Sequence, residues 1–159
     1  MMKNTKLMFS YGMNTNSQEM AYRCPEARSM GSATLADHEF RFATHADIVE
    51  SPGGVVHGVL WDITEDCLAS LDILEGFPVY YERKIVAVTD QEGNSVDAIT
   101  YYMTRDKPDS LPSDSYLLML YEGYAEHNVP AYQIVDAVNY INSYQSAVGT
   151  KGSYYYDYQ

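Results

Sequence analysis

The hydrophobic periodicity of the chain changes near Ser113, and this change limits the folds that the chain can adopt. Before Ser113, apolar residues alternate or form short runs bounded by glycine, proline and asparagine, which is typical of β-strands. After it, apolar residues recur every three or four positions, which is typical of helices. Because strands come first, with helices inserted among them, and further helices are gathered at the end, the order predicts an α+β fold rather than a doubly wound sheet.

The same patterns place the individual elements. Strands are predicted over residues 7–11, 33–44, 55–61, 79–89 and 96–104. Helices are predicted over 18–23 and 64–75, and in two stretches after Ser113 that Asn128-Val129-Pro130 separates. Residues 51–54 (Ser-Pro-Gly-Gly) are predicted to form a turn, and residues 91–94 a hairpin loop.

The length of 159 residues fits one domain. We expect a single domain over 1–159, with a core at about 7–145 and a peripheral, tyrosine-rich tail at 146–159. The 16 tyrosines suit strands and the walls of polar pockets, because each offers an apolar ring and a polar tip. The sequence indicates no particular oligomeric state.

The net charge of −12 limits the partners. Nucleic-acid binding needs a surplus of lysine and arginine, so no DNA or RNA partner is expected. An anionic membrane surface would repel the chain for the same reason. Small anions are compatible with this charge, because backbone amides can bind them locally.

The two cysteines, Cys24 and Cys67, lie far apart in the sequence and belong to no metal-binding motif. They are predicted to be reduced, buried thiols of a cytoplasmic protein. The apolar stretch Leu7-Met8-Phe9 is too short for the core of a signal peptide. No run of residues approaches the roughly 20 apolar residues that a membrane span needs.

The segment Leu7–Asn14 is predicted as a strand that enters a glycine turn at Gly12 and then a helix. A turn of this kind leaves backbone N–H groups without partners, and these groups can bind a carboxylate. The segment has neither the GxxxxGK[ST] nor the GxGxxG pattern of nucleotide-binding loops. Local chemistry alone is therefore compatible with a structural turn and with an anion site.

Glu75 ends the helix predicted over 64–75. The helix dipole disfavours a carboxylate at this end. Such a placement is tolerated on a surface, and it also occurs where a carboxylate with a raised pKa is held for proton transfer. The position alone leaves both interpretations open.

Other chemistry is weakly supported by the sequence. The four histidines form no HxH, HxxxH or HExxH pair, so no metal site is expected. No serine lies in a GxSxG motif. Cys24 has no evident histidine partner in the sequence that would make it a nucleophile.

Four short segments, taken in order, resemble the γ-glutamylcyclotransferase-like family, which includes the AIG2-like proteins. The first is similar to the family's strand and YGSN-type loop, and the second to its M..RCP.A and G.A.L stretches. The third resembles the G.ly.i, LD..EG and Y.r signature, and the fourth resembles the C-terminal helix. The matching residues are 9–14, then 20–27 with 31–35, then 55–63 with 71–76 and 81–83, and finally 112–113, 116 and 122–126.

The resemblance implies a small, mixed, barrel-like β-sheet with flanking helices and a central cavity. It also implies an enzyme that cyclises a γ-glutamyl amine, amino acid or peptide to 5-oxoproline and releases the amine, without metal or cofactor. The substrate's own α-amine attacks its γ-carbonyl, so holding the substrate folded meets much of the barrier. One carboxylate can take a proton from the attacking amine and return one to the leaving amine.

Glu75 matches the family's catalytic glutamate. By the same resemblance, the backbone amides of Gly12, Met13 and Asn14 would hold the α-carboxylate of the substrate. Three tyrosines would line the pocket and offer hydroxyl groups: Tyr11, Tyr81 and Tyr116.

Met13 departs from the family pattern, because the loop usually has serine at this position. If the residue acts through its backbone N–H, the change is tolerated; if the serine hydroxyl contacts the ligand, affinity or substrate choice is altered. Tyr81 is assigned in preference to Tyr80 from its spacing to Arg83. The alternative function is a non-catalytic pocket protein that binds or sequesters a small anionic ligand, for example a nucleotide-derived signal. A third is a structural or interaction protein, suggested by the tyrosines and the tail.

Overall fold

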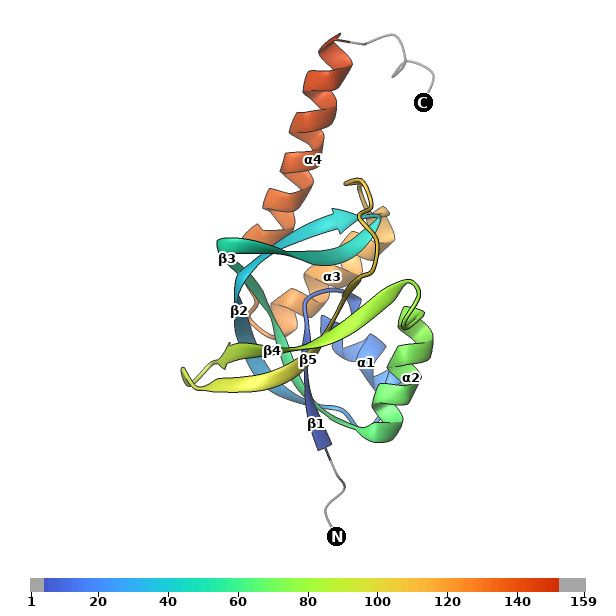
Figure 1. The fold of residues 1–159 in the computed structure, drawn as a ribbon, viewed down its shortest axis with the longest axis vertical. Helices are drawn as coiled ribbons and strands as arrows, with labels where there is room; N and C mark the ends of the chain where they lie inside the picture. Colours follow the sequence, from blue (N-terminus) through green and yellow to red (C-terminus); the bar gives the residue numbers. More distant parts are fainter. Residues whose placement is uncertain (1–4, 152–159) are drawn as a thin grey trace.

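The computed structural model describes residues 5–151. Five strands form a closed barrel in the order β1-β3-β2-β4-β5, with helices packed around it (Figure 1). The strands are β1 (Thr5–Ser10), β2 (Arg28–Ala43), β3 (His45–Thr64), β4 (Tyr81–Asp90) and β5 (Ser95–Met103). The helices are α1 (Ser17–Arg23), α2 (Glu65–Glu75), α3 (Asp114–Glu126) and α4 (Tyr132–Lys151), and a 3₁₀ turn, η1, spans Met13–Thr15. The predicted α+β class with a barrel-like sheet is confirmed.

The barrel closes through β1. This strand pairs antiparallel with β3 along its whole length, and it pairs in parallel with β5 where Met8 lies opposite Ile99. β2 pairs with β3 and β4, and β4 pairs with β5, so each strand has a neighbour on both sides. Closure of the barrel places the buried Phe9 and Val59 in the core.

The turn predicted at 51–54 is wrong, because these residues lie inside β3. The chain reverses instead at Thr44, between β2 and β3. Gly53 has a φ of 83° and donates its N–H to Asp37 Oδ1 at 2.9 Å, next to a shift in the β2–β3 register. The glycine therefore forms a bulge that bends the long hairpin, which is a common use of glycine within strands.

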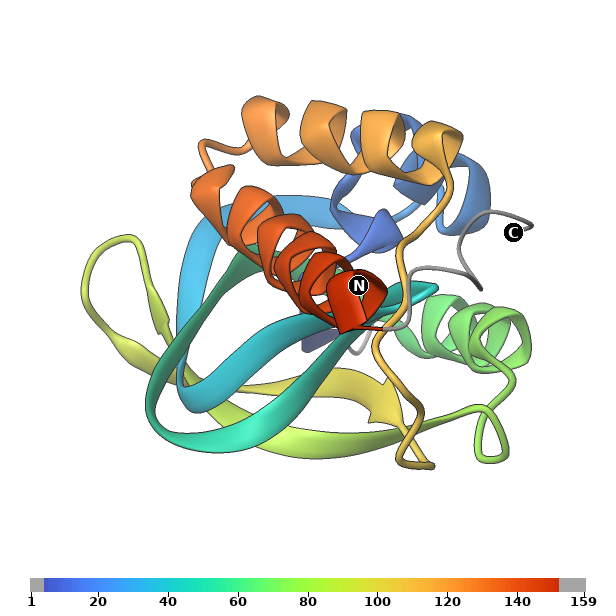
Figure 2. The same cartoon turned by 90° about the horizontal axis from the view of Figure 1, so that it is seen from above.

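The helices cover separate parts of the barrel. Figures 1 and 2 show α3 and α4 along one side, with α4 extending beyond the barrel, and α2 on another side. The tail predicted from residue 146 begins inside α4, which continues to Lys151, and its remaining residues lie outside the described range. Among the helices of the described residues, none is long and apolar enough to cross a membrane.

The prediction of two reduced cysteines is also wrong. Cys24 caps the C-terminus of α1, Cys67 lies in the first turn of α2, and the two form a disulfide. Both residues are buried. The sequence conceals this pairing because 43 positions separate the two residues, and only the packing of α1 near α2 brings them together.

We predict that removing the disulfide lowers stability without changing the fold. Closing a loop with a sequence separation of 43 residues restricts the unfolded chain and is worth about 4 kcal/mol by the loop-entropy relation. The measurement is urea unfolding of the wild type with and without dithiothreitol. Dithiothreitol should leave the Cys24→Ser/Cys67→Ser variant unchanged, and equal midpoints for oxidised and reduced wild type would contradict the prediction.

Candidate active site

The loop after β1 begins the site. In η1 the carbonyl of Gly12 accepts the backbone N–H of Thr15 at 3.0 Å, and it also accepts the Thr15 hydroxyl at 2.8 Å. Asn16 then caps α1, because its side chain accepts two amides of the first helical turn. The amides of Gly12, Met13 and Asn14 precede the first hydrogen bond of the turn, so the turn itself supplies no acceptor for them.

Helix α3 holds this loop in place. The hydroxyl of the fully buried Tyr124 donates to the carbonyl of Tyr11 at 2.6 Å. The side-chain amide of Asn16 donates to a carbonyl of α3 at 2.9 Å. Gly123 allows the close approach, since a Cβ atom there would lie 2.5 Å from Thr15 Oγ1 and 2.7 Å from the backbone nitrogen of Asn16. The direction of the loop amides therefore depends on α3.

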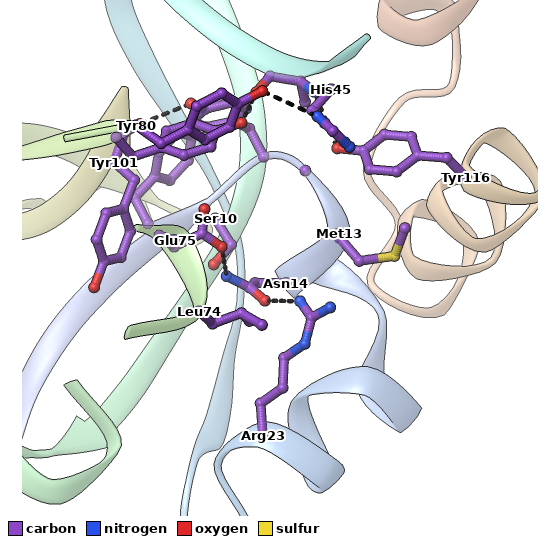
Figure 3. Close-up of a pocket in the computed structure, with 15 residues that line it drawn as sticks. Ser10, Met13, Asn14, Arg23, His45, Leu74, Glu75, Tyr80, Tyr101 and Tyr116 are labelled. Carbon is purple, nitrogen blue, oxygen red and sulfur yellow. Dashed lines mark hydrogen bonds between the residues drawn. The ribbon is translucent and has the colours of Figure 1, made fainter. Parts of the chain in front are cut away.

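A pocket of about 310 Å³ lies beside the loop. It brings together all seven residues that the sequence singled out, although they come from four parts of the chain (Figure 3). These residues are Tyr11, Gly12, Met13, Asn14, Glu75, Tyr81 and Tyr116.

Glu75 enters the pocket from the last position of α2. Gly76 ends the helix in the left-handed conformation, with a φ of 67°, and thereby fixes where the chain turns away. The side-chain amide of Asn14 donates to Glu75 Oε1 at 3.5 Å, and its oxygen accepts a hydrogen bond from Arg23 (Figure 3). Arg23 also pairs with Glu19 at 3.2 Å. A hydrogen-bonded chain thus links the guanidinium of α1 to the carboxylate of α2.

Burial raises the pKa of the Glu75 carboxyl above its ordinary value. The positive charge of Arg23 and the hydrogen bond from Asn14 act in the opposite direction, but desolvation is the largest effect. A carboxyl group with a raised pKa holds and releases a proton nearer to neutral pH than an ordinary glutamate does. Glu75 therefore has the electrostatic surroundings of a proton-transfer group.

The three predicted tyrosines differ in what their hydroxyls do. Tyr11 donates to the carbonyl of Tyr101, and Tyr81 donates to the carbonyl of Ala46, both at 2.7 Å. Tyr116 instead accepts the N–H of Ala46 at 3.0 Å, which leaves its own proton available. Burial raises the pKa of Tyr116 to about 12, so this proton is retained at neutral pH. The hydroxyl groups of Tyr11 and Tyr81 are therefore committed to hydrogen bonds within the pocket wall, while that of Tyr116 can donate to a ligand.

The structure adds pocket residues that sequence reasoning missed. Arg23 could have been found from its place in the Arg-Cys-Pro segment, one helical turn after Glu19. His45 lies at the reversal between β2 and β3, and burial lowers the pKa of its imidazole. The sequence analysis assigned no role to the others, which are Phe9, Ser10, Ala46, Leu74, Tyr80 and Tyr101. In the described part of the chain, no group of three or more His, Cys, Asp or Glu side chains is placed to hold a metal ion.

Comparison with known proteins points to one family. The model of the family described as gamma-glutamyl cyclotransferase, AIG2-like, matches residues 8–118. The gamma-glutamylcyclotransferase of Bos taurus is 31% identical over 137 residues, which cover 78% of this chain and 72% of that protein. The protein of the same name from Homo sapiens matches with the same identity and coverage.

Solved structures agree with the sequence matches. A gamma-glutamyl cyclotransferase superposes with a TM-score of 0.76 at 30% identity, over 82% of this chain and 85% of that one. YkqA from Bacillus subtilis superposes with a TM-score of 0.74 at 23% identity, over 89% of this chain and 55% of that one. This second likeness concerns the fold alone.

We predict that Gly123→Ala displaces the loop from α3. Alanine favours a helix over glycine by about 1 kcal/mol. The added methyl group would meet backbone atoms of Thr15 and Asn16, which cannot move aside as a flexible side chain could. Overpacking of this kind costs about 1–3 kcal/mol, so the midpoint of thermal unfolding should fall. Glu122→Ala, on the exposed side of the same helix, is the control. A Gly123→Ala midpoint at or above that of the wild type would disprove the tight contact.

Proposed function

The chain belongs to the gamma-glutamyl cyclotransferase, AIG2-like family, and from this premise we propose that it cyclises its substrate with Glu75 as the general acid and base. Its family membership makes it an enzyme of the γ-glutamylcyclotransferase type. The substrate is a γ-glutamyl amine, amino acid or peptide, and the products are 5-oxoproline and the released amine. The observation that carries the assignment of Glu75 is that this carboxyl group, with its raised pKa, lines the same pocket as the loop residues Gly12, Met13 and Asn14.

The reaction needs proton transfers at two nitrogen atoms that are bonded to one carbon atom. The α-ammonium group of the substrate loses a proton, its nitrogen attacks the γ-carbonyl carbon, and the same nitrogen loses a second proton as the ring forms. The bond from that carbon to the leaving nitrogen breaks as this nitrogen gains a proton. Glu75 can serve both steps, because it accepts the first proton as a carboxylate and donates it as a carboxylic acid.

The loop and Arg23 would hold the other end of the substrate. The amides of Gly12, Met13 and Asn14 supply donors for its α-carboxylate, and the guanidinium of Arg23 supplies a compensating charge at the same pocket. Holding the carboxylate here while Glu75 engages the amine would fold the substrate toward the geometry of attack.

Met13 is consistent with a backbone role at its position. Figure 3 shows its side chain pointing away from Glu75. A role through the backbone N–H does not depend on the side chain, so replacement of the family's usual serine by methionine would preserve this carboxylate donor. Met13 then shapes the wall beside Tyr116 instead of contacting the reacting atoms.

We further propose that the chain forms one domain and acts in the cytoplasm without a nucleic-acid or membrane partner. The net charge of −12 supports the absence of a nucleic-acid partner. The cysteines no longer support a reducing compartment, because they are paired. Fractionation of cells, with the Cys24–Cys67 bond assayed in each fraction, tests the compartment.

The decisive experiment measures 5-oxoproline after incubation with a panel of γ-glutamyl amines, amino acids and peptides. We predict that Glu75→Gln lowers kcat by about 10²–10⁴-fold, the range for loss of a general acid and base. Glutamine keeps the shape and the contact with Asn14, so folding should be unaffected.

Glu92→Gln makes the same change in charge on the exposed β4–β5 loop and should retain full activity. Full turnover by Glu75→Gln would remove Glu75 from the mechanism. No turnover of any panel member by the wild type, together with tight binding of a nucleotide, would favour the sequestering alternative.

We also predict a shift in pH dependence when Arg23 is replaced. The charge of Arg23 lowers the pKa of Glu75, so Arg23→Met should raise that pKa further. Because the first step needs the carboxylate, kcat/KM of the wild type should rise as pH increases through the Glu75 pKa. This acidic limb should move to higher pH in Arg23→Met.

Arg28→Met is the matched control, because it removes an exposed guanidinium that pairs with Asp62 and does not line the pocket. Its acidic limb should coincide with that of the wild type. An unshifted limb in Arg23→Met would show that Arg23 does not act on the group that titrates.

A further inference from the structure

Ser10, the last residue of β1, carries a buried hydroxyl without a partner. The residue is 6% exposed, and its Oγ has no hydrogen bond within the described structure. Two other buried side-chain atoms share this condition, Trp61 Nε1 and Asp62 Oδ1, but neither residue lines the pocket, whereas Ser10 does. Because an unpaired buried polar group is unfavourable, its occurrence at a reaction pocket calls for a functional explanation.

Each of the other hydroxyl groups on the pocket wall has a hydrogen-bond partner within the protein. Tyr11 and Tyr81 donate to backbone carbonyls. Tyr101 donates to Asp72 Oδ1 at 2.6 Å, and Tyr80 lies 3.2 Å from His45 Nδ1. Tyr116 accepts the N–H of Ala46 and keeps a free proton, but Figure 3 shows it across the pocket from Glu75.

Ser10 lies on the same side of the pocket as Glu75 (Figure 3). This side is where charge must develop during cyclisation. Both nitrogen atoms that exchange protons with Glu75 are bonded to the γ-carbonyl carbon in the tetrahedral intermediate, so the oxygen of that intermediate lies nearby. A donor for this oxygen must lie near Glu75 and must not already be committed to the protein.

We propose that the Ser10 hydroxyl donates a hydrogen bond to the γ-carbonyl oxygen of the substrate as it becomes an oxyanion. This role rests on the proposed function of Glu75. Attack forms the bond from the α-nitrogen to the γ-carbon, and the π-electron pair of the carbonyl moves onto oxygen, where Ser10 stabilises it. When the pair returns, the bond to the leaving nitrogen breaks as that nitrogen takes a proton from Glu75, and the ring nitrogen gives up its second proton to the Glu75 carboxylate so formed. Ser10 keeps its own proton throughout.

The side chain can reach this position by a small motion. Serine has one side-chain torsion with three staggered wells, so its hydroxyl can turn between the wall and the pocket without backbone movement. In the structure the Ser10 hydroxyl has no hydrogen-bond partner among the described residues. The developing oxyanion supplies that partner, so the interaction is stronger in the transition state than in the free enzyme.

The test compares Ser10→Ala with a second buried hydroxyl. Removing one oxyanion donor lowers kcat by about 10²-fold, and we expect this loss in Ser10→Ala with KM nearly unchanged. Since the lost hydroxyl had no partner, the thermal midpoint should stay level or rise. Thr100→Val removes a hydroxyl that donates to the carbonyl of Phe9 at 3.0 Å and lies outside the pocket. That control should melt at a lower temperature and retain its kcat.

Ser10→Cys is a second variant, which keeps the size of the side chain and weakens the donor. Its kcat should lie between those of the wild type and Ser10→Ala. Wild-type kcat in a folded Ser10→Ala or Ser10→Cys variant would overturn the role of Ser10 and leave Glu75 untouched. A loss expressed in KM alone would also overturn it, because it would indicate substrate binding. Absence of 5-oxoproline with wild-type protein would instead overturn the proposed function, and Ser10 with it.

Discussion

The contact between α3 and the loop after β1 is the constraint on which the pocket depends. A loop of six residues cannot fix the direction of its own amides, because half of it lies outside regular structure. The buried hydroxyl of Tyr124 holds the carbonyl of Tyr11, and the absence of a side chain at Gly123 lets the helix reach the backbone at Thr15. The hydroxyl of Tyr124 in turn accepts a hydrogen bond from Gln133 of α4 at 2.8 Å. Elements far from Glu75 in sequence thus decide where the donors opposite it point.

Burial and the neighbouring polar groups shift the pKa of Glu75 in opposite directions, and burial has the larger effect. Arg23 and Asn14 favour the charged carboxylate, yet desolvation leaves the pKa raised. A group whose pKa is raised in the folded state binds its proton more tightly there, so it stabilises the fold at acidic pH. That contribution is lost as the pH rises through the folded-state pKa. Ionised Glu75 therefore lowers stability at neutral pH, and the disulfide between α1 and α2 offsets part of this by restricting the unfolded chain.

The sequence predicted what depends on local chemistry. The run into Gly12, the helix that follows it and the helix that ends at Glu75 are all set by neighbouring residues, and the structure has them. Contacts between distant residues were missed. The Cys24–Cys67 bond was one, and the bulge at Gly53 was another, since Ser-Pro-Gly-Gly has the composition of a turn until pairing with β2 makes it part of a strand.

In the pocket, too, the sequence indicated which residues are present but not which hydrogen bonds their hydroxyl groups form. The resemblance placed the tyrosines in the pocket. It could not show that the hydroxyl groups of Tyr11 and Tyr81 donate to backbone carbonyls. It gave no reason to notice Ser10, because a serine in a strand has no distinguishing pattern. Which polar groups remain unpaired is a property of the packed structure, since each one depends on the partners that folding brings to it. The donors that remain unpaired are what the protein can offer to charge that develops in the pocket, beside the carboxyl group of Glu75.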